Sequence, residues 1–144
     1  MVFASLTRLR VGSIFYLPAF IRANEAAVKE IMQIPGFLGG AELTDKGLVF
    51  WTITYWQDET AMKSFRNCEA HCKAMQNLPD WCSEASYTHW TDDNMPKTID
   101  WKLMHEKMIQ DGKLTKVRRP SKRQLTKDYP QVKWSKLQRP LKGY

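Results

Sequence analysis

The segment from Leu48 to Trp56 most constrains the fold of this chain, because it reads as a strand without a polar face. It is rich in β-branched and aromatic residues, which suit a pleated strand. Side chains alternate across a strand, so one face carries Phe50 while the other carries Trp51 and Ile53. We therefore predict a strand covered on both sides, for example by helices on one side and by a cavity or a second sheet on the other.

The segments on either side of this strand alternate between the strand and helix periods. Their order is β-α-β-β-α-β, which predicts an α+β fold with a ferredoxin-like protomer, one antiparallel sheet and helices on one face. We expect the paired Gly39 and Gly40 to mark a bulge or a close approach of two backbones. The predicted elements are strands over 10–17, 37–43, 48–56 and 83–91, a helix over 23–32 capped by Asn24, a short helix capped by Asp58, and a helical piece over 69–78 limited by Pro79.

A further amphipathic helix is predicted over 99–110, within the segment 96–112. Trp101, Met104 and Met108 share one face of it, and Gly112 supplies its end. An apolar stripe of this kind usually packs against other parts of a protein. We therefore expect this helix to pack on the edge of the domain, which spans residues 8–92, or across a dimer interface.

The positive charge of the chain is concentrated in a basic, extended tail over 113–144. The tail holds eleven Lys or Arg residues and one acid, Asp128, so its net charge is +10, whereas residues 1–112 carry −3. Few aliphatic residues and three prolines indicate that the tail can bury little and need not fold by itself. We expect it to wrap around the acidic domain or a partner subunit. Its predicted anchors are Val117, Leu125, Tyr129, Trp134 and Leu137.

Length and composition indicate one domain with a core of its own, because the chain has 144 residues, of which 43% are hydrophobic and 26% charged. No apolar run approaches the roughly 20 residues that span a bilayer, and the first ten residues lack the pattern of a signal peptide. Cys68, Cys72 and Cys82 are an odd set that does not suggest a disulfide framework. We therefore expect a cytoplasmic protein.

Several classes of chemistry have no motif in the sequence. It shows no Gly-rich phosphate loop, no Ser-His-Asp arrangement and no pair of catalytic carboxylates. Cys68, His71 and Cys72 contain zinc-binding groups, but a structural site needs further ligands that Cys82 alone does not supply, so we predict no metal site. Nucleic acid is a disfavoured partner, because the tail has cations but few aromatic residues for stacking.

The chain resembles a known family over roughly residues 8–92. The resemblance rests on four features: the glycine turn 36–40, the aromatic strand 50–56, the helix that begins at Asp58, and His71 with the following Ala74 and Met75. Together they are similar to the antibiotic biosynthesis monooxygenase family and its dimeric α+β barrel relatives. The resemblance implies a homodimer in which the sheet of one protomer pairs with that of the other. The segment from His71 and the later Trp81 are also similar to haem monooxygenases of the spheroidene type.

His71 is the candidate catalytic residue, because a neutral imidazole beside an apolar cavity can ligate haem iron or move a proton. The alternative is a structural, hydrogen-bonded histidine. In a cofactor-free enzyme, Trp51 and Asn67 would join His71 to orient and deprotonate the substrate. The predicted substrate-binding residues are Phe15, Ile53, Trp56, Phe65, Met75 and Trp90. Such aromatic residues are also common in ordinary cores.

Two functional classes remain open. The first is a monooxygenase-like oxidoreductase that acts on a small or elongated apolar substrate, either without a cofactor or with haem bound by His71. The second is a non-catalytic dimeric barrel that binds a hydrophobic ligand or haem. Absorbance of a bound haem would separate these alternatives.

Overall fold

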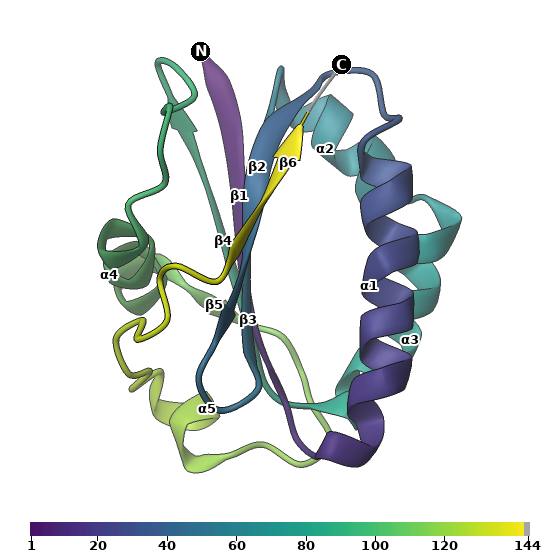
Figure 1. Ribbon diagram of the computed structural model, residues 1–144, viewed down its shortest axis with the longest axis vertical. Coiled ribbons are helices and arrows are strands. Elements are labelled where there is room, and N and C mark those ends of the chain that lie inside the picture. Colours follow the sequence, from purple (N-terminus) through teal and green to yellow (C-terminus); the bar gives the residue numbers. More distant parts are fainter. Residues whose placement is uncertain (143–144) are drawn as a thin grey trace.

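The computed structural model describes residues 1–142, which form one antiparallel sheet with helices on both faces (Figure 1). The strand order is β5-β4-β1-β3-β2-β6. The predicted α+β fold class and the β-α-β-β-α-β order of the core are confirmed. The strands are β1 (Val2–Val11), β2 (Phe37–Asp45), β3 (Val49–Trp56), β4 (Cys82–Asp92), β5 (Lys113–Leu114) and β6 (Gln138–Lys142). The helices are η1 (Ile14–Tyr16, 3-10), α1 (Leu17–Ile31), α2 (Glu59–Arg66), α3 (Glu69–Trp81), α4 (Trp101–Asp111) and α5 (Lys122–Thr126).

The first strand begins earlier than predicted. β1 spans Val2–Val11, and the predicted strand over 10–17 is wrong. Ser13 ends the extended segment because its side chain accepts a hydrogen bond from the backbone N–H of Phe15. Pro18 lies in the first turn of α1, where a missing N–H costs no helical hydrogen bond. Proline therefore starts this helix instead of ending a strand.

The structure also corrects two helix boundaries. α1 begins at Leu17, so Asn24 lies inside the helix and does not cap it. α3 continues to Trp81 and includes Pro79 in its last turn. The predicted start of α2 and the predicted end of α4 agree with the structure. Asp58 accepts a hydrogen bond from the N–H of Ala61 at the start of α2, and Gly112 ends α4.

The hairpin of β2 and β3 has the predicted bulge. The pairing register shifts between Phe37 and Gly39, and the following Gly40 pairs with Thr54. A Cβ atom on Gly40 would collide with the carbonyl oxygen of Ile53. Glycine is therefore required here by the close approach of the two backbones.

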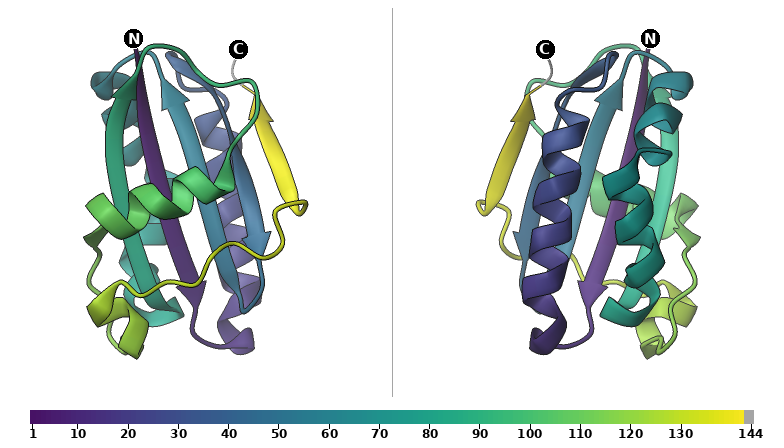
Figure 2. Two further views of the ribbon diagram at one scale, coloured as in Figure 1. Left: turned by 90° about the vertical axis from the view of Figure 1, so that its left-hand side faces the viewer. Right: turned by 90° about the vertical axis from the view of Figure 1, so that its right-hand side faces the viewer.

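The two faces of the sheet are covered by different helices (Figure 2). α1 and α3 lie against one face, and α4 crosses the other. Trp101, Met104 and Met108 of α4 are buried with Trp51 and Ile53 of β3, as part of one hydrophobic cluster. The apolar stripe of α4 therefore packs on the sheet of its own chain.

The C-terminal tail runs along its own domain. Its strands β5 and β6 extend the sheet next to β4 and β2, respectively. Val117 and Tyr129 are buried anchors, as expected, whereas the other three predicted anchors are exposed: Leu125, Trp134 and Leu137. Polar contacts also hold the tail on the domain. Asp45 accepts hydrogen bonds from the backbone N–H groups of Lys133 and Trp134.

Candidate functional site

A cavity of about 530 Å³ lies between the sheet and the helices α1 and α3. The helices supply most of its apolar wall, and the strands supply hydroxyl groups. The apolar lining includes Phe20, Ala27, Val28, Ile31, Met62, Phe65, Ala74, Met75, Leu78 and Trp81. This mixture of an apolar wall and a few polar groups is typical of a small-molecule site.

The polar floor of the cavity follows from the alternation of side chains along β1 and β3. Ser5 and Thr7 of β1 and Thr52 and Thr54 of β3 line it. Thr54 Oγ1 accepts a hydrogen bond from the indole N–H of Trp56 at 2.9 Å. Hydroxyl groups can both donate and accept hydrogen bonds, so this floor can orient an oxygen-containing ligand.

One side of the cavity carries a linked pair of polar side chains. The amide of Asn24 donates a hydrogen bond of 2.7 Å to Glu42 Oε2, which joins α1 to β2. The other oxygen of Glu42 accepts a hydrogen bond from Arg139 of β6. Both Asn24 and Glu42 line the cavity. Neither was among the predicted site residues, because Asn24 was predicted to be a helix cap and Glu42 lies in the predicted strand 37–43.

His71 lies in the first turns of α3, and its ring lines the cavity. Its Nδ1 lies 3.0 Å from the backbone carbonyl oxygen of Arg66. A carbonyl only accepts, so Nδ1 carries the proton and Nε2 keeps its lone pair. Burial lowers the pKa of His71 and favours this neutral form. The edge of the ring packs on Phe65, with 5.0 Å between the ring centroids.

A second imidazole, His89 of β4, also lines the cavity. It lies between the rings of Phe3 and Tyr87, at centroid distances of 5.3 and 5.5 Å. Burial lowers its pKa as well. His89 was not among the predicted site residues, although its spacing of two residues from Tyr87 along β4 places both side chains on one face.

The structure brings some of the predicted site residues together. His71, Phe65 and Met75 line the cavity. Trp56 is buried next to it and stacks on Phe65, with 5.8 Å between the ring centroids. Asn67 ends α2 as its C-cap residue and is not part of the lining.

Four predicted site residues lie away from the cavity. Trp51 and Ile53 are buried on the opposite face of the sheet, with Trp90 packed against the same cluster. Phe15 is 88% exposed in η1. The predicted alternation of side chains along β3 is correct. Both faces of this strand are bulky, however, so the sequence pattern does not reveal which face lines the cavity.

The described residues, 1–142, contain no group of three or more His, Cys, Asp or Glu side chains that could hold a metal ion. Burial raises the pKa of Cys82 to about 12, so this side chain stays a neutral thiol. A haem is compatible with the chemistry of the cavity, because His71 offers an unprotonated Nε2 and Arg66 offers a cation for a propionate group.

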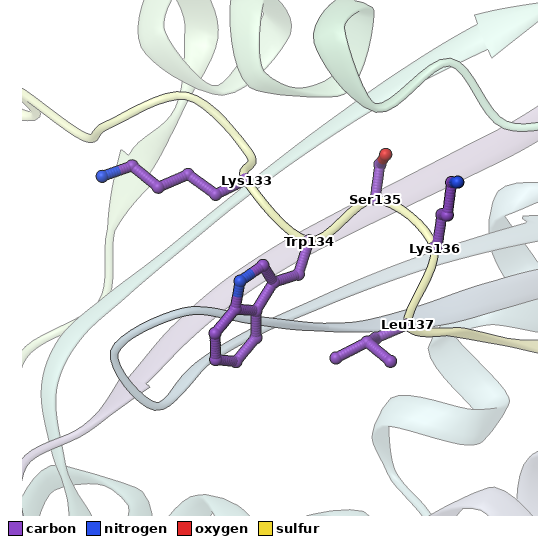
Figure 3. Close-up of a pocket in the computed structure, with 5 residues that line it drawn as sticks. All are labelled: Lys133, Trp134, Ser135, Lys136 and Leu137. Atoms are coloured by element: carbon purple, nitrogen blue, oxygen red, sulfur yellow. The ribbon is translucent and has the colours of Figure 1, made fainter.

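A second, shallower pocket of about 350 Å³ is formed by five consecutive tail residues (Figure 3). Trp134 and Leu137 provide its apolar side chains, and Lys133 and Lys136 flank them. This pocket contains no imidazole or carboxylate, so the larger cavity is the candidate for proton-transfer chemistry.

Comparison with solved structures confirms the resemblance of the fold. One neighbour is "Putative antibiotic biosynthesis monooxygenase from Nitrosomonas europaea", with a TM-score of 0.57 and 12% identity over 64% of this chain and 90% of that chain. A protein of the same description from Bacteroides thetaiotaomicron has a TM-score of 0.58 and 16% identity, over 69% of this chain and 96% of that one.

A third neighbour is SnoaB, a cofactor-independent oxygenase from Streptomyces nogalater, with a TM-score of 0.54 and 14% identity over 67% of this chain and 98% of that chain. At these identities the similarity establishes the fold. No family model matches the sequence. No curated protein matches it either.

Proposed function

We propose that the protein is a monooxygenase-like oxidoreductase whose active site is the cavity between the sheet and the helices α1 and α3. The observation that carries this proposal is the state of His71, whose Nδ1 is bound by the Arg66 carbonyl while its Nε2 is left basic at the cavity wall. The fold that the chain shares with proteins named as monooxygenases supports the same class of reaction.

The lining favours a small or elongated apolar substrate that carries an oxygen atom. The apolar side chains of α1 and α3 would exclude water from the reacting carbon. The hydroxyl groups of Thr52 and Thr54, together with Asn24, would orient a phenol or ketone oxygen of the substrate. Glu42 holds the Asn24 amide in place.

In the cofactor-free reaction, His71 Nε2 removes a proton from an acidic CH₂ group of the substrate. The resulting carbanion gives electrons to dioxygen, and a C–O bond forms. The protonated His71 then returns its proton, and loss of water from the hydroperoxide leaves a ketone. The balance is one CH₂ and one O₂ converted to one C=O and one H₂O.

A haem-dependent reaction is the second candidate, because an imidazole with a free Nε2 is also an axial ligand. Haem would supply oxygen activation, and the chain would bind it through His71 with Arg66 near a propionate. A non-catalytic barrel that binds a hydrophobic ligand or haem is the third. These candidates differ in measurable absorbance and in oxygen consumption.

Oxygen uptake with anthrone tests the cofactor-free proposal, because the CH₂ group of anthrone is acidic and flanked by aryl rings. We expect the wild type to consume oxygen and His71→Gln to lose about 100-fold or more in rate, which is the usual contribution of a general base. The matched control is His105→Gln, since His105 bonds the carbonyl of Tyr129 on the α4 side of the sheet.

A Soret band on titration with haem, lost in His71→Ala and kept in His105→Gln, would favour the haem-dependent candidate. Absence of both oxygen uptake and a Soret band would contradict an oxygenase and leave the ligand-binding barrel. The homodimer through the sheet stays a prediction. Within residues 1–142, α4 and Tyr129 cover the sheet face that points away from α1 and α3.

A further inference from the structure

Four segments that are distant in sequence meet at one end of the molecule. These are the turn around η1, the β2–β3 turn, the end of α3, and the tail from 115 to α5 (lower end in Figures 1 and 2). Backbone hydrogen bonds connect them. The N–H of Val11 donates to Leu48, that of Gly12 donates to Trp81, and that of Ser121 donates to Ser83.

This end carries large apolar side chains that point away from the core. Phe15 is 88% exposed, Leu125 is 71% exposed and Ile14 is 66% exposed. Single exposed apolar residues are common on soluble proteins. Here, however, three of the most exposed ones lie on η1 and α5, at the same end of the fold.

The same end is strongly basic. We define the basic end by six exposed cations of these segments: Lys46, Lys116, Arg118, Arg119, Lys122 and Arg123. Within residues 1–142, Arg118 is the one that forms an ion pair, with Asp80 at 2.6 Å. The segments 12–17, 46–48, 78–81 and 115–128 contain one further acid, Asp128. Most of this charge is therefore available to an external anion.

We propose that the basic end docks the protein on an anionic lipid surface, with Phe15, Ile14 and Leu125 inserted between the headgroups. Each cation near such a surface adds attraction that decays within a Debye length. Apolar side chains add burial in the boundary between headgroups and acyl chains. A nucleic acid would use the cations but would give the protruding aliphatic side chains of Ile14 and Leu125 no apolar phase.

The test is co-sedimentation of the full chain with vesicles of phosphatidylcholine alone or with one-quarter phosphatidylglycerol. We expect binding to the anionic vesicles at 50 mM NaCl, at least about tenfold weaker binding at 500 mM NaCl, and little binding to the neutral vesicles. Phe15→Ser should weaken binding about tenfold. Leu103→Ser, which removes an exposed apolar side chain of α4, should leave it unchanged.

The charge contribution has its own pair of variants. Arg119→Glu with Lys122→Glu should abolish binding at 50 mM NaCl, whereas Lys97→Glu with Lys102→Glu makes the same change in net charge away from the basic end and should retain most of it. Circular dichroism verifies that each variant is folded. Equal losses in the two double variants, no binding at low salt, or salt-dependent binding to duplex DNA that exceeds vesicle binding would overturn the proposal.

Discussion

A single hydrogen bond sets the chemistry of the imidazole in the cavity. The carbonyl of Arg66 accepts from Nδ1 of His71, and burial lowers the pKa of the ring. At neutral pH the side chain is therefore uncharged, and its lone pair lies on Nε2. His105 also bonds a backbone carbonyl, but it does so on the opposite side of the sheet. The two histidines therefore differ in their position in the fold: His71 lines the cavity and His105 does not.

The lowered pKa values of His71 and His89 predict how stability depends on pH. In the folded protein, the pKa of each ring lies below its ordinary value of 6.5. The unfolded chain therefore binds more protons in the range just below pH 6.5. The contribution of the two neutral rings to the free energy of unfolding should be fully present above pH 6.5. It should be lost as the pH falls from 6.5 through the lowered pKa values. Urea unfolding at pH 7.5 and pH 5.0 measures this loss.

The matched variant for this prediction is His71→Gln with His89→Gln. It should show a smaller loss of stability between pH 7.5 and pH 5.0 than the wild type, because two groups that gain protons on unfolding are gone. A loss of the same size in both proteins would contradict the assignment of neutral rings.

Trp51 gives a second prediction at this scale. It is buried under α4, beside Met104 and Met108, and does not line the cavity. Trp51→Ala should lower the free energy of unfolding by about 3–5 kcal/mol. Trp51→Phe should keep the rate of oxygen uptake within about twofold of the wild type. A loss in Trp51→Phe as large as that in His71→Gln would show that Trp51 acts in the site.

At the scale of elements, α5 attaches the tail to the domain through hydrogen bonds to β4, next to the strand pairings of β5 and β6. The buried Gln124 accepts a hydrogen bond from the N–H of Ala85, and its amide donates to the carbonyls of Ala85 and Thr115, each at 3.0 Å. Ser121 adds a hydrogen bond of 2.9 Å to Glu84, which also pairs with the buried Arg8 at 2.6 Å. The tail therefore completes the hydrogen bonding of the β4 edge.

Removal of this anchor should destabilise the whole fold. Gln124→Ala deletes four hydrogen bonds, three to the backbone of Ala85 and Thr115 and one from the hydroxyl of Tyr129, at a cost of about 2–4 kcal/mol. Leu125→Ala changes the next residue of α5, which is exposed, and should cost less than about 0.5 kcal/mol. Urea unfolding compares the two. Equal effects would indicate that α5 is loosely attached.

Element type was largely predictable from the sequence, because the strand and helix periods and the Asp58 cap are local signals. The position of the tail was not, since a buried glutamine such as Gln124 has no recognisable pattern. The start of β1 was missed because the N-terminal strand mixes Arg8 and Arg10 with apolar residues, and Arg8 is buried only through its pairing with Glu84. Burial by pairing is a tertiary effect.

The candidate site was predictable only in part, for a similar reason. His71, Phe65 and Met75 follow β3 at helical spacing and line the cavity. Thr52 and Thr54 appear as ordinary strand residues until the sheet is placed against α1 and α3. The choice between the two bulky faces of β3 depends on which helices cover each face, and α4 lies nearly fifty residues later in the chain.

At the scale of the whole molecule, the sheet separates two environments. One face packs on α4 and forms a core, whereas the other encloses a cavity with two imidazoles. Among residues 1–142, no helix is long and apolar enough to cross a membrane. The basic end lies at the lower end of the molecule, where η1, α5 and the β2–β3 turn are found (Figure 2). The proposed substrate binding and proton transfer share the cavity, and the proposed surface attachment lies at one end of the fold.

The central claim is that the cavity under α1 and α3, with His71 at its wall, is the site that binds a small apolar molecule. Nuclear magnetic resonance of the ¹⁵N-labelled protein during titration with anthrone tests this most directly. We predict shifts for the ring nitrogens of His71 and for amides of Ala27, Thr52 and Phe65, with the signals of α4 unchanged. Shifts confined to α4 and the neighbourhood of Trp51, with His71 unaffected, would contradict the account.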